Sequence, residues 1–260
     1  MSSQEPPKIY TKNYINADDV FTFSHGGTSG YLHDSDPLSK LLSSGANADT
    51  TTMSVVIQFY EGSVATTRTI DTFFLLNHNY KTWALYYWDT DTSAWVSAAS
   101  ETVDAAANTV KSFTAFTTSQ IKIEVSATQV ANAEKYAGEM IACALTLNVG
   151  YDMAAYTPKF REKKKELQLG DGSVHQVLTR FTPYRTQKYD ANVQLKFVAY
   201  ATKELLRAIK EAGMPFLWQP EPTSRPEDVR YVHWWNAFDA KFVSSYKTAG
   251  FVINMELREV

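Results

Sequence analysis

The segment Ile121-Lys-Ile-Glu-Val125 alternates apolar side chains with charged ones, one residue at a time. This period of two is typical of a β-strand with one face in a core and the other in water. Residues 141–149 alternate in the same way, while residues 53–60 and 70–76 are more continuously apolar, as expected of strands buried on both faces. Residues 20–149 therefore predict an all-β sandwich or barrel.

The composition excludes several classes of protein. A chain of 260 residues is long enough for two modest domains. Its 25 basic and 28 acidic residues give a formal charge of -3, so we expect no basic field that would hold a nucleic acid. The single cysteine, Cys143, excludes an intrachain disulfide and a multi-thiolate metal cluster. Residues 1–8 are polar, and no stretch approaches the roughly 18 apolar residues of a membrane span, so we expect neither a signal peptide nor membrane insertion.

The composition shifts near residue 155. Pro158 precedes the charged run Lys159-Phe-Arg-Glu-Lys-Lys-Lys-Glu166, which is typical of a linker or of the water-exposed start of a new domain. Its acidic residues dilute its basic ones, so a solvated face is favoured over a binding patch. The sequence thus predicts an N-terminal arm over 1–19, a sandwich over 20–154 and a second β domain over 155–260.

The second domain is predicted to be a β-sheet with one packed helix. Asp171-Gly172 lies between two short runs and predicts a hairpin turn, since glycine supplies the positive φ that such turns need. The sequence predicts that Thr202 caps a helix that Gly213 and Pro215 end. The expected strands around this helix are residues 192–199, 216–218, 229–244 and 250–259.

Residue patterns for catalysis are weak. The histidines, at positions 25, 33, 78, 175 and 233, show no spacing typical of metal ligands. His25-Gly26-Gly27 is similar to the oxyanion segment of esterases and Ser29 is near, but the Gly-x-Ser-x-Gly elbow is missing, which favours a plain glycine turn. No Gly-Lys-Ser/Thr follows these glycines or Gly30, so they are not expected to cradle a phosphate. We expect no catalytic residue and no cofactor.

Two kinds of side chain remain as candidates for binding. The carboxylates Asp34, Asp36, Asp89 and Asp91 lie on predicted loops that could hold calcium, although ordinary turn capping is favoured and no metal is expected. Aromatic rings crowd positions 83–95, where they either fill a core or stack on a sugar or a protein partner. The candidate ligand contacts are His33, Asp34, Asp89, Asp91 and Trp95.

The segment Thr72-Phe-Phe-Leu-Leu-Asn-His-Asn-Tyr80, followed by Ala84-Leu-Tyr-Tyr-Trp88 and a turn before Trp95, resembles the discoidin or coagulation-factor type C family. This resemblance implies a galactose-binding-like jelly roll over residues 20–149. Such modules are non-catalytic and present the loops at one end to glycans, lipids or proteins. The chain lacks the terminal cysteine pair of the extracellular members.

The segment Glu204-Leu-Leu-Arg207, with Gly213-Met-Pro-Phe-Leu-Trp-Gln-Pro220 and the closing strands, resembles the tail-tube-like domains of bacteriophage tail-tip and baseplate proteins. That resemblance implies a virion tail component that assembles as a homo-oligomeric ring, contacts other tail proteins and touches a host-surface glycan. A free-standing carbohydrate-binding protein is the alternative. A glycan-cleaving enzyme, which needs a placed pair of carboxylates, ranks third.

Overall fold

The computed structural model describes residues 6–34, 40–149, 152–168, 174–179, 187–226, 228–244 and 249–260. The chain forms two compact units. One, the sandwich unit, is Lys12–Leu145; the other, the sheet unit, joins Met1–Thr11 to Thr146–Val260. Both are mainly β, and the described residues contain one α-helix. The predicted fold class, a β-sandwich followed by a β-sheet with one helix, is confirmed.

The sandwich unit consists mainly of two antiparallel sheets. The five-stranded sheet has the order β2-β4-β11-β8-β9, and the three-stranded sheet has the order β10-β7-β13. Their strands are β2 (Val20–Phe23), β4 (Met53–Gln58), β7 (Arg68–Leu76), β8 (Tyr80–Asp89), β9 (Ala94–Glu101), β10 (Thr109–Thr118), β11 (Gln120–Thr128) and β13 (Glu139–Cys143). Smaller elements are η1 (Ser29–Leu32), β3 (Leu41–Leu42), β5 (Tyr60–Glu61), β6 (Val64–Ala65) and β12 (Tyr136–Ala137).

The two sheets share one core. Val55 and Ile123 from the five-stranded sheet and Phe73 and Leu75 from the three-stranded sheet belong to the same buried cluster. The alternation in β11 appears as predicted, because its apolar side chains are buried while Lys122 is partly exposed. Burial alternates in the same way along β4, so the expectation that residues 53–60 are buried on both faces is wrong.

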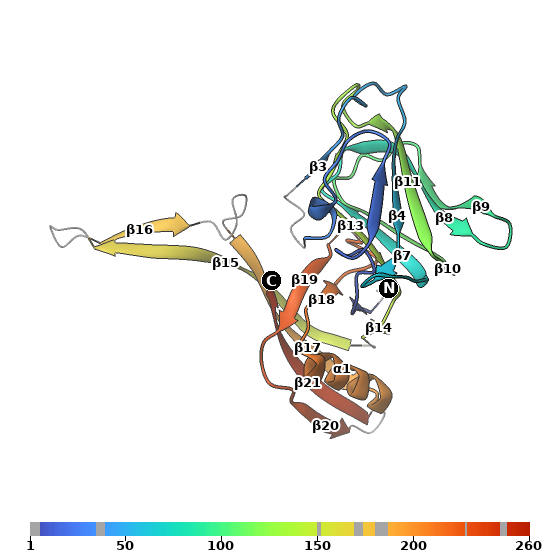
Figure 1. The fold of residues 1–260 in the computed structure, drawn as a ribbon. Coiled ribbons are helices and arrows are strands. Elements are labelled where there is room, and N and C mark those ends of the chain that lie inside the picture. The colour runs from blue at the N-terminus through green and yellow to red at the C-terminus, as the bar shows by residue number, and fades with distance from the viewer. Residues whose placement is uncertain are drawn as a thin grey trace. The chain divides into compact units, whose positions relative to one another are not determined.

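The sheet unit is built on a nine-stranded sheet. The strand order is β14-β1-β18-β19-β21-β17-β15-β16, and β20 also pairs with β21. Its elements are β1 (Lys8–Tyr10), β14 (Leu147–Asn148), β15 (Asp152–Gln168), β16 (Val174–Thr179), β17 (Gln187–Val198), α1 (Tyr200–Ala212), β18 (Phe216–Gln219), β19 (Arg230–Trp234), β20 (Ala240–Ser244) and β21 (Ala249–Glu259). In Figure 1, α1 lies along the sheet and the β15–β16 hairpin extends beyond the other strands of its unit.

The helix covers one face of this sheet. Leu206 on α1 is fully buried in a cluster with Val193, Leu195, Ile253 and Met255, which alternate along β17 and β21. Because strand side chains alternate between faces, the residues between these positions lie on the opposite face, away from α1.

Several expected element bounds are corrected by the structure. The expected arm 1–19 contains β1, whose Ile9 pairs with Trp218, so the N-terminal strand belongs to the sheet unit. Residues 141–149 do not form one strand but β13 and β14, because the chain leaves one unit and enters the other between them. The change of unit falls at Leu145, before the expected boundary near 155.

Two expectations for the sheet unit also change. The helix begins at Tyr200 after Ala199, which makes no side-chain cap, so Thr202 lies inside α1 rather than capping it; Gly213 ends the helix as predicted. Residues 229–244 form β19 and β20, separated at 235–239. The predicted turn Asp171-Gly172 lies outside the described residues, but the strands on either side of it pair as a hairpin.

A bulge between β17 and β21 explains one glycine. The register shifts between Leu195 and Val198, and Phe197 takes a positive φ of 54°. A Cβ on Gly250 would lie 2.5 Å from the backbone carbonyl carbon of Phe197. Only glycine therefore allows the two strands to approach this closely.

Candidate functional site

The outer face of the five-stranded sheet carries a group of aromatic rings. Tyr86 and Trp88 on β8, Trp95 on β9 and Lys122 on β11 lie on this face, and we call them the aromatic surface. Strand register brings them together, because Tyr86 pairs with Lys122 and Trp88 pairs with Trp95. All four side chains are partly exposed.

The rings of this surface hold one another in a fixed arrangement. The ring centroids of Trp88 and Trp95 lie 5.4 Å apart and the ring planes meet at 72°, an edge-to-face geometry that aromatic pairs favour. The Lys122 ammonium lies 4.8 Å from the Tyr86 ring centroid and 4.9 Å from that of Trp95. Its Nζ also forms a 2.7 Å ion pair with Glu124. Lys122 of β11 therefore contacts a ring on β8 and a ring on β9, while both rings keep partial access to solvent.

The neighbouring aromatic side chains on β8 point the other way. Trp83 is 2% exposed and Leu85 is 1% exposed, both in the core. Tyr87 stacks on Phe116 with ring centroids 4.2 Å apart and packs against the same core. Alternation along one strand therefore divides the aromatic crowd into core and surface, which composition alone left open.

Asp89 and Asp91 shape the turn at the end of this hairpin. Asp89 accepts hydrogen bonds from the Thr92 hydroxyl at 2.8 Å and from the Asp91 backbone N–H at 2.9 Å. These bonds, led by that from Thr92, lower the pKa of Asp89. Its carboxylate therefore serves as a local turn cap. Among the candidates from the sequence, the structure brings together Asp89, Asp91 and Trp95.

The other two candidates lie at the opposite edge of the sheet. His33 follows η1 and its ring stacks on Phe21 of β2, with centroids 5.7 Å apart. Asp34 is exposed beside it, and Asp36 lies outside the described residues. Three strands separate β2 from β9, so these residues do not share one binding site with Trp95.

The glycine segment after β2 forms a packed turn. Gly26 has a positive φ of 33°, and a Cβ on Gly27 would lie 2.8 Å from the Leu41 side chain and 2.9 Å from that of Phe23. Close packing and backbone conformation therefore account for these glycines. His25 Nδ1 contacts the Ser24 hydroxyl at 2.9 Å, and Ser24 Oγ in turn accepts the Ser54 backbone N–H at 2.8 Å.

The Asn77-His78-Asn79 segment is a buried structural centre. His78 Nδ1 accepts the Tyr80 backbone N–H at 3.1 Å, and its Nε2 lies 3.1 Å from the Thr109 hydroxyl. That hydroxyl donates to Asp104 Oδ2 at 2.7 Å, so its oxygen is left to accept the His78 Nε2–H. Asn79 uses both ends of its amide to hold backbone groups of Glu134 and Tyr136.

Burial sets the charge states of this centre. Loss of water around the 1% exposed His78 lowers its pKa to about 4, against the opposing attraction of Asp104. Burial alone would raise the pKa of Asp104, but hydrogen bonds from Trp83, Thr109 and Ala106 outweigh it and hold the pKa below its usual value. At neutral pH the pair is a neutral imidazole beside a carboxylate. Every imidazole nitrogen is engaged, so the segment holds loops together.

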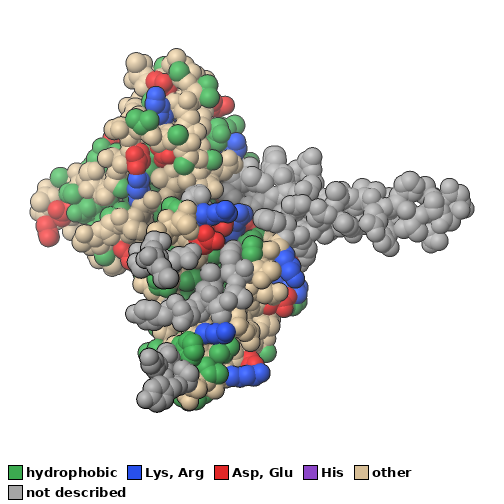
Figure 2. All heavy atoms as spheres, turned by 180° about the vertical axis from the view of Figure 1, so that it is seen from behind, with side chains coloured by type: hydrophobic (Ala, Val, Ile, Leu, Met, Phe, Trp, Pro, Cys, Tyr) green, Lys and Arg blue, Asp and Glu red, His purple; other side chains and the backbone are tan. Residues whose placement is uncertain are grey.

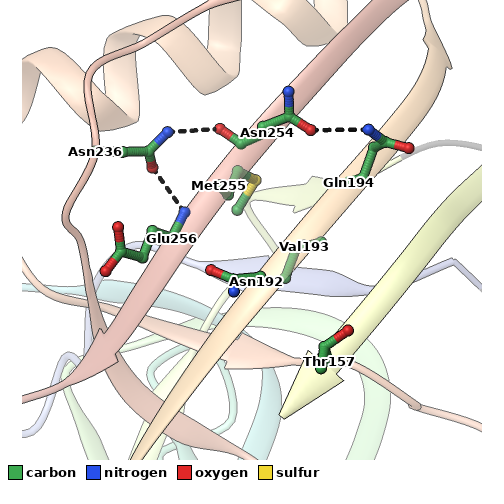
Figure 3. Close-up of a pocket in the computed structure, with 8 residues that line it drawn as sticks. All are labelled: Thr157, Asn192, Val193, Gln194, Asn236, Asn254, Met255 and Glu256. Carbon is green, nitrogen blue, oxygen red and sulfur yellow. Dashed lines mark hydrogen bonds between the residues drawn. The ribbon is translucent and has the colours of Figure 1, made fainter. Parts of the chain in front are cut away.

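A second feature lies on the sheet unit, on the face of β17 and β21 that is away from α1. It is a shallow groove of about 340 Å³ whose polar lining consists of Thr157, Asn192, Gln194, Asn236, Asn254 and Glu256 (Figure 3). Strand register brings these side chains together, because Asn192 pairs with Glu256 and Gln194 pairs with Asn254. The sequence candidates did not include this groove; its only signal is the pair of amides Asn192 and Gln194 at alternate positions of β17, with Asn254 on β21.

The charges of the described surface are mixed. Figure 2 shows Lys and Arg side chains interspersed with Asp and Glu on the face in view. No group of three or more His, Cys, Asp or Glu residues with metal-binding geometry occurs in the described part of the chain. None of the helices formed by the described residues has the length and apolar character needed to cross a membrane.

No family model matches the sequence, and no curated protein matches it. Similar solved structures include chitosan-binding module 1 of a chitosanase/glucanase from Paenibacillus sp. IK-5, at 12% identity and a TM-score of 0.41 over 50% of this chain and 98% of that one. The family 32 carbohydrate-binding module of NanJ from C. perfringens, solved with galactose, is 9% identical with a TM-score of 0.42 over 53% of this chain and 99% of the module.

The module CpGH89CBM32-5 from Clostridium perfringens, solved with GalNAc-β-1,3-galactose, is 12% identical with a TM-score of 0.42. It covers 51% of this chain and 100% of its own length. In each case about half of the present chain is similar to a whole module. Identities and TM-scores this low assign no ligand and no activity to the chain.

Proposed function

We propose that the chain is a non-catalytic carbohydrate-binding protein that holds a saccharide against the aromatic surface of its sandwich unit. The observation that carries the proposal is the placement of Trp88 and Trp95, partly exposed and mutually fixed, on the outer side of the β8–β9 hairpin. A pyranose ring has an apolar face of C–H groups and a rim of hydroxyls. An aromatic ring offers a matching apolar face at little cost in side-chain entropy.

Polar groups beside the rings would orient the sugar. Lys122 supplies ammonium protons and Glu124 supplies carboxylate oxygens, and the two are already paired at 2.7 Å. Ser97, opposite Tyr86 on β9, is exposed and adds a hydroxyl that both donates and accepts. A few fixed polar groups around an apolar platform are the usual composition of a small-molecule site.

Binding of saccharide probes tests this proposal. Galactose and GalNAc-β-1,3-galactose are suitable probes because the two C. perfringens modules were solved with them. Chitotriose is a third, because chitosan-binding module 2 of the Paenibacillus sp. IK-5 enzyme was solved with it. In calorimetric titrations of the whole chain, the Trp88→Ala/Trp95→Ala variant should bind at least about tenfold more weakly than the parent chain, equivalent to about 1.4 kcal/mol. The matched control is Tyr31→Ala, which removes a 45% exposed ring elsewhere on the same unit.

An equal loss of saccharide affinity in both variants, or no loss in the double variant, would show that the aromatic surface is not the binding site. The two surface substitutions are not expected to unfold the unit, which far-UV circular dichroism checks. Detection of cleaved probe would overturn the non-catalytic part of the proposal and leave binding intact.

The tail assignment is a separate matter. Location in a virion, a ring formed through residues 155–260 and contacts with other tail proteins remain predictions that rest on the sequence resemblance. A glycan-binding chain fits either a virion that touches a host surface or a free-standing protein. Sedimentation of the purified chain separates a closed oligomer from a monomer.

A further inference from the structure

We propose that the groove of the sheet unit is a second, independent binding site, and that its ligand is a neutral saccharide. It lies on β15, β17, β21 and the segment after β19, so it shares no residue with the aromatic surface. Its volume of about 340 Å³ falls within the range of small-molecule sites.

The amides of the groove are held in place by the protein itself. Asn236 Oδ1 accepts the Trp234 indole N–H at 2.9 Å and the Glu256 backbone N–H at 2.6 Å, while its Nδ2 donates to the Asn254 carbonyl at 3.0 Å. Gln194 Nε2 donates to Asn254 Oδ1 at 3.0 Å (Figure 3). These bonds leave the Nδ2 group of Asn254 and the Oε1 atom of Gln194 for water or a ligand. Asn192, which is exposed, adds another amide.

The charge of the lining excludes ionic ligands. Glu256 is the one charged residue among the groove residues, and Arg258 neutralises it through bonds of 3.0 and 2.6 Å from Nε and Nη2. The remaining polar groups are amides and a hydroxyl, which both donate and accept hydrogen bonds. Hydroxyl groups of a neutral sugar match this lining, whereas an anion or a cation would find no unpaired opposite charge among the lining residues.

An exposed indole lies beside the groove residue Glu256, because the Trp235 backbone N–H donates to the Glu256 carbonyl at 2.7 Å. Trp235 is 58% exposed, and the Arg258 guanidinium lies 4.1 Å from its ring centroid. The arginine therefore holds the ring from one side while much of the indole faces water. An amide row next to a fixed, open indole provides hydrogen bonds and a stacking face for one saccharide.

The backbone around the groove excludes the main alternative, an extended peptide. A peptide is commonly captured by adding a strand to a sheet edge. β17 is central, paired with β15 on one side and β21 on the other, so its hydrogen-bonding groups are already used. The groove lies on the face of paired strands, so it offers a ligand side-chain groups and not backbone groups.

Titration of the full chain with lactose, cellobiose and maltose tests the second site. The measurement uses the Trp88→Ala/Trp95→Ala background, so that binding at the aromatic surface is silent. At least one disaccharide should bind at millimolar concentration or below, and Asn192→Ala and Trp235→Ala should each weaken it at least about fivefold. Leu205→Ala, a change at a 48% exposed position on α1, which covers the other face of the sheet, should leave it unchanged.

Absence of binding in that background, or binding insensitive to both groove substitutions, overturns the groove proposal. Neither result affects the aromatic surface, whose test compares the parent chain with the Trp88→Ala/Trp95→Ala variant. Trp235→Phe keeps an aromatic face and should restore part of the affinity lost in Trp235→Ala. Equal losses in the two variants would likewise contradict a stacking role.

Discussion

The two units use similar polar side chains in opposite settings. In the sandwich unit, His78, Asn79 and Asp104 are buried and bonded to loops around them. In the sheet unit, Asn192, Gln194 and Asn254 face a groove and have amide atoms that can bond to water or a ligand. Buried polar groups need partners inside the protein, and surface groups do not. Burial, more than residue type, therefore separates structural networks from sites that can bind.

The largest expected effect tests whether the units are stabilised separately. Gly250→Ala places a methyl group against the Phe197 backbone and should cost about 3 kcal/mol or more, because neither strand can move without breaking the β17–β21 pairing. Urea unfolding should show the sheet unit unfolding earlier and the sandwich unit unchanged. Gly30→Ala, where added atoms meet open space, is the control. Equal effects of the two substitutions would refute the packing argument.

The second effect is specific to the buried network. The pKa of His78 is about 4 in the folded chain and 6.5 when unfolded, so the unfolded state binds a proton first as pH falls. Stability should be constant above about pH 6.5 and should fall between about pH 6.5 and 4, by an amount on the order of 3 kcal/mol. Asp104, whose folded pKa is lowered, adds to the loss only at still lower pH.

The non-titrating variant His78→Gln separates this effect from other acid groups. Its unfolding free energy, measured by urea titration at a series of pH values, should change much less between pH 6.5 and 4 than that of the parent chain. The same slope in both proteins would show that His78 is not the group responsible.

The third effect concerns the one amide in the groove that also has a structural role. Asn236→Ala leaves the indole N–H of the buried Trp234 without its acceptor and should cost about 2 kcal/mol. Thermal unfolding of the variant measures this loss. A variant as stable as the parent chain would mean that the Asn236 contacts contribute little.

The smallest effect is expected at the groove's exposed surface. Gln194→Ala removes a bond between the partly exposed Gln194 and the exposed Asn254, and it should change the unfolding free energy by no more than about 0.5 kcal/mol. The contrast with Asn236→Ala, measured in the same assay, sharpens the distinction between the two kinds of amide. A loss of unfolding free energy comparable to that of Asn236→Ala would contradict the distinction between the two kinds of amide.

Much of the local structure could be predicted from the sequence. The alternation in Ile121–Val125 correctly indicated a strand with one wet face, and Gly213 correctly indicated the end of α1. Pairing between distant segments could not be predicted, because alternation says which face a residue occupies and not which strand lies beside it. For that reason β1 was assigned to an arm, although Ile9 pairs with Trp218.

The candidate site could be predicted in part for the same reason. Trp95 was a candidate, but its partners Trp88 and Lys122 come from strands whose register the sequence does not show. The groove was missed entirely, because Thr157, Asn192 and Asn254 meet only after three strands pair. His33 and Asp34 are candidate ligand contacts together with Trp95, but sheet order places them at the other edge.

The most direct test of carbohydrate binding follows the indole N–H signals of the chain by NMR during titration with the three saccharide probes of the proposed site. If the chain binds saccharide there, the signals of Trp88 and Trp95 should move with saccharide concentration, while those of the buried Trp83, Trp218 and Trp234 should stay in place. Signals of Trp88 and Trp95 that stay fixed at every concentration of all three probes would contradict it.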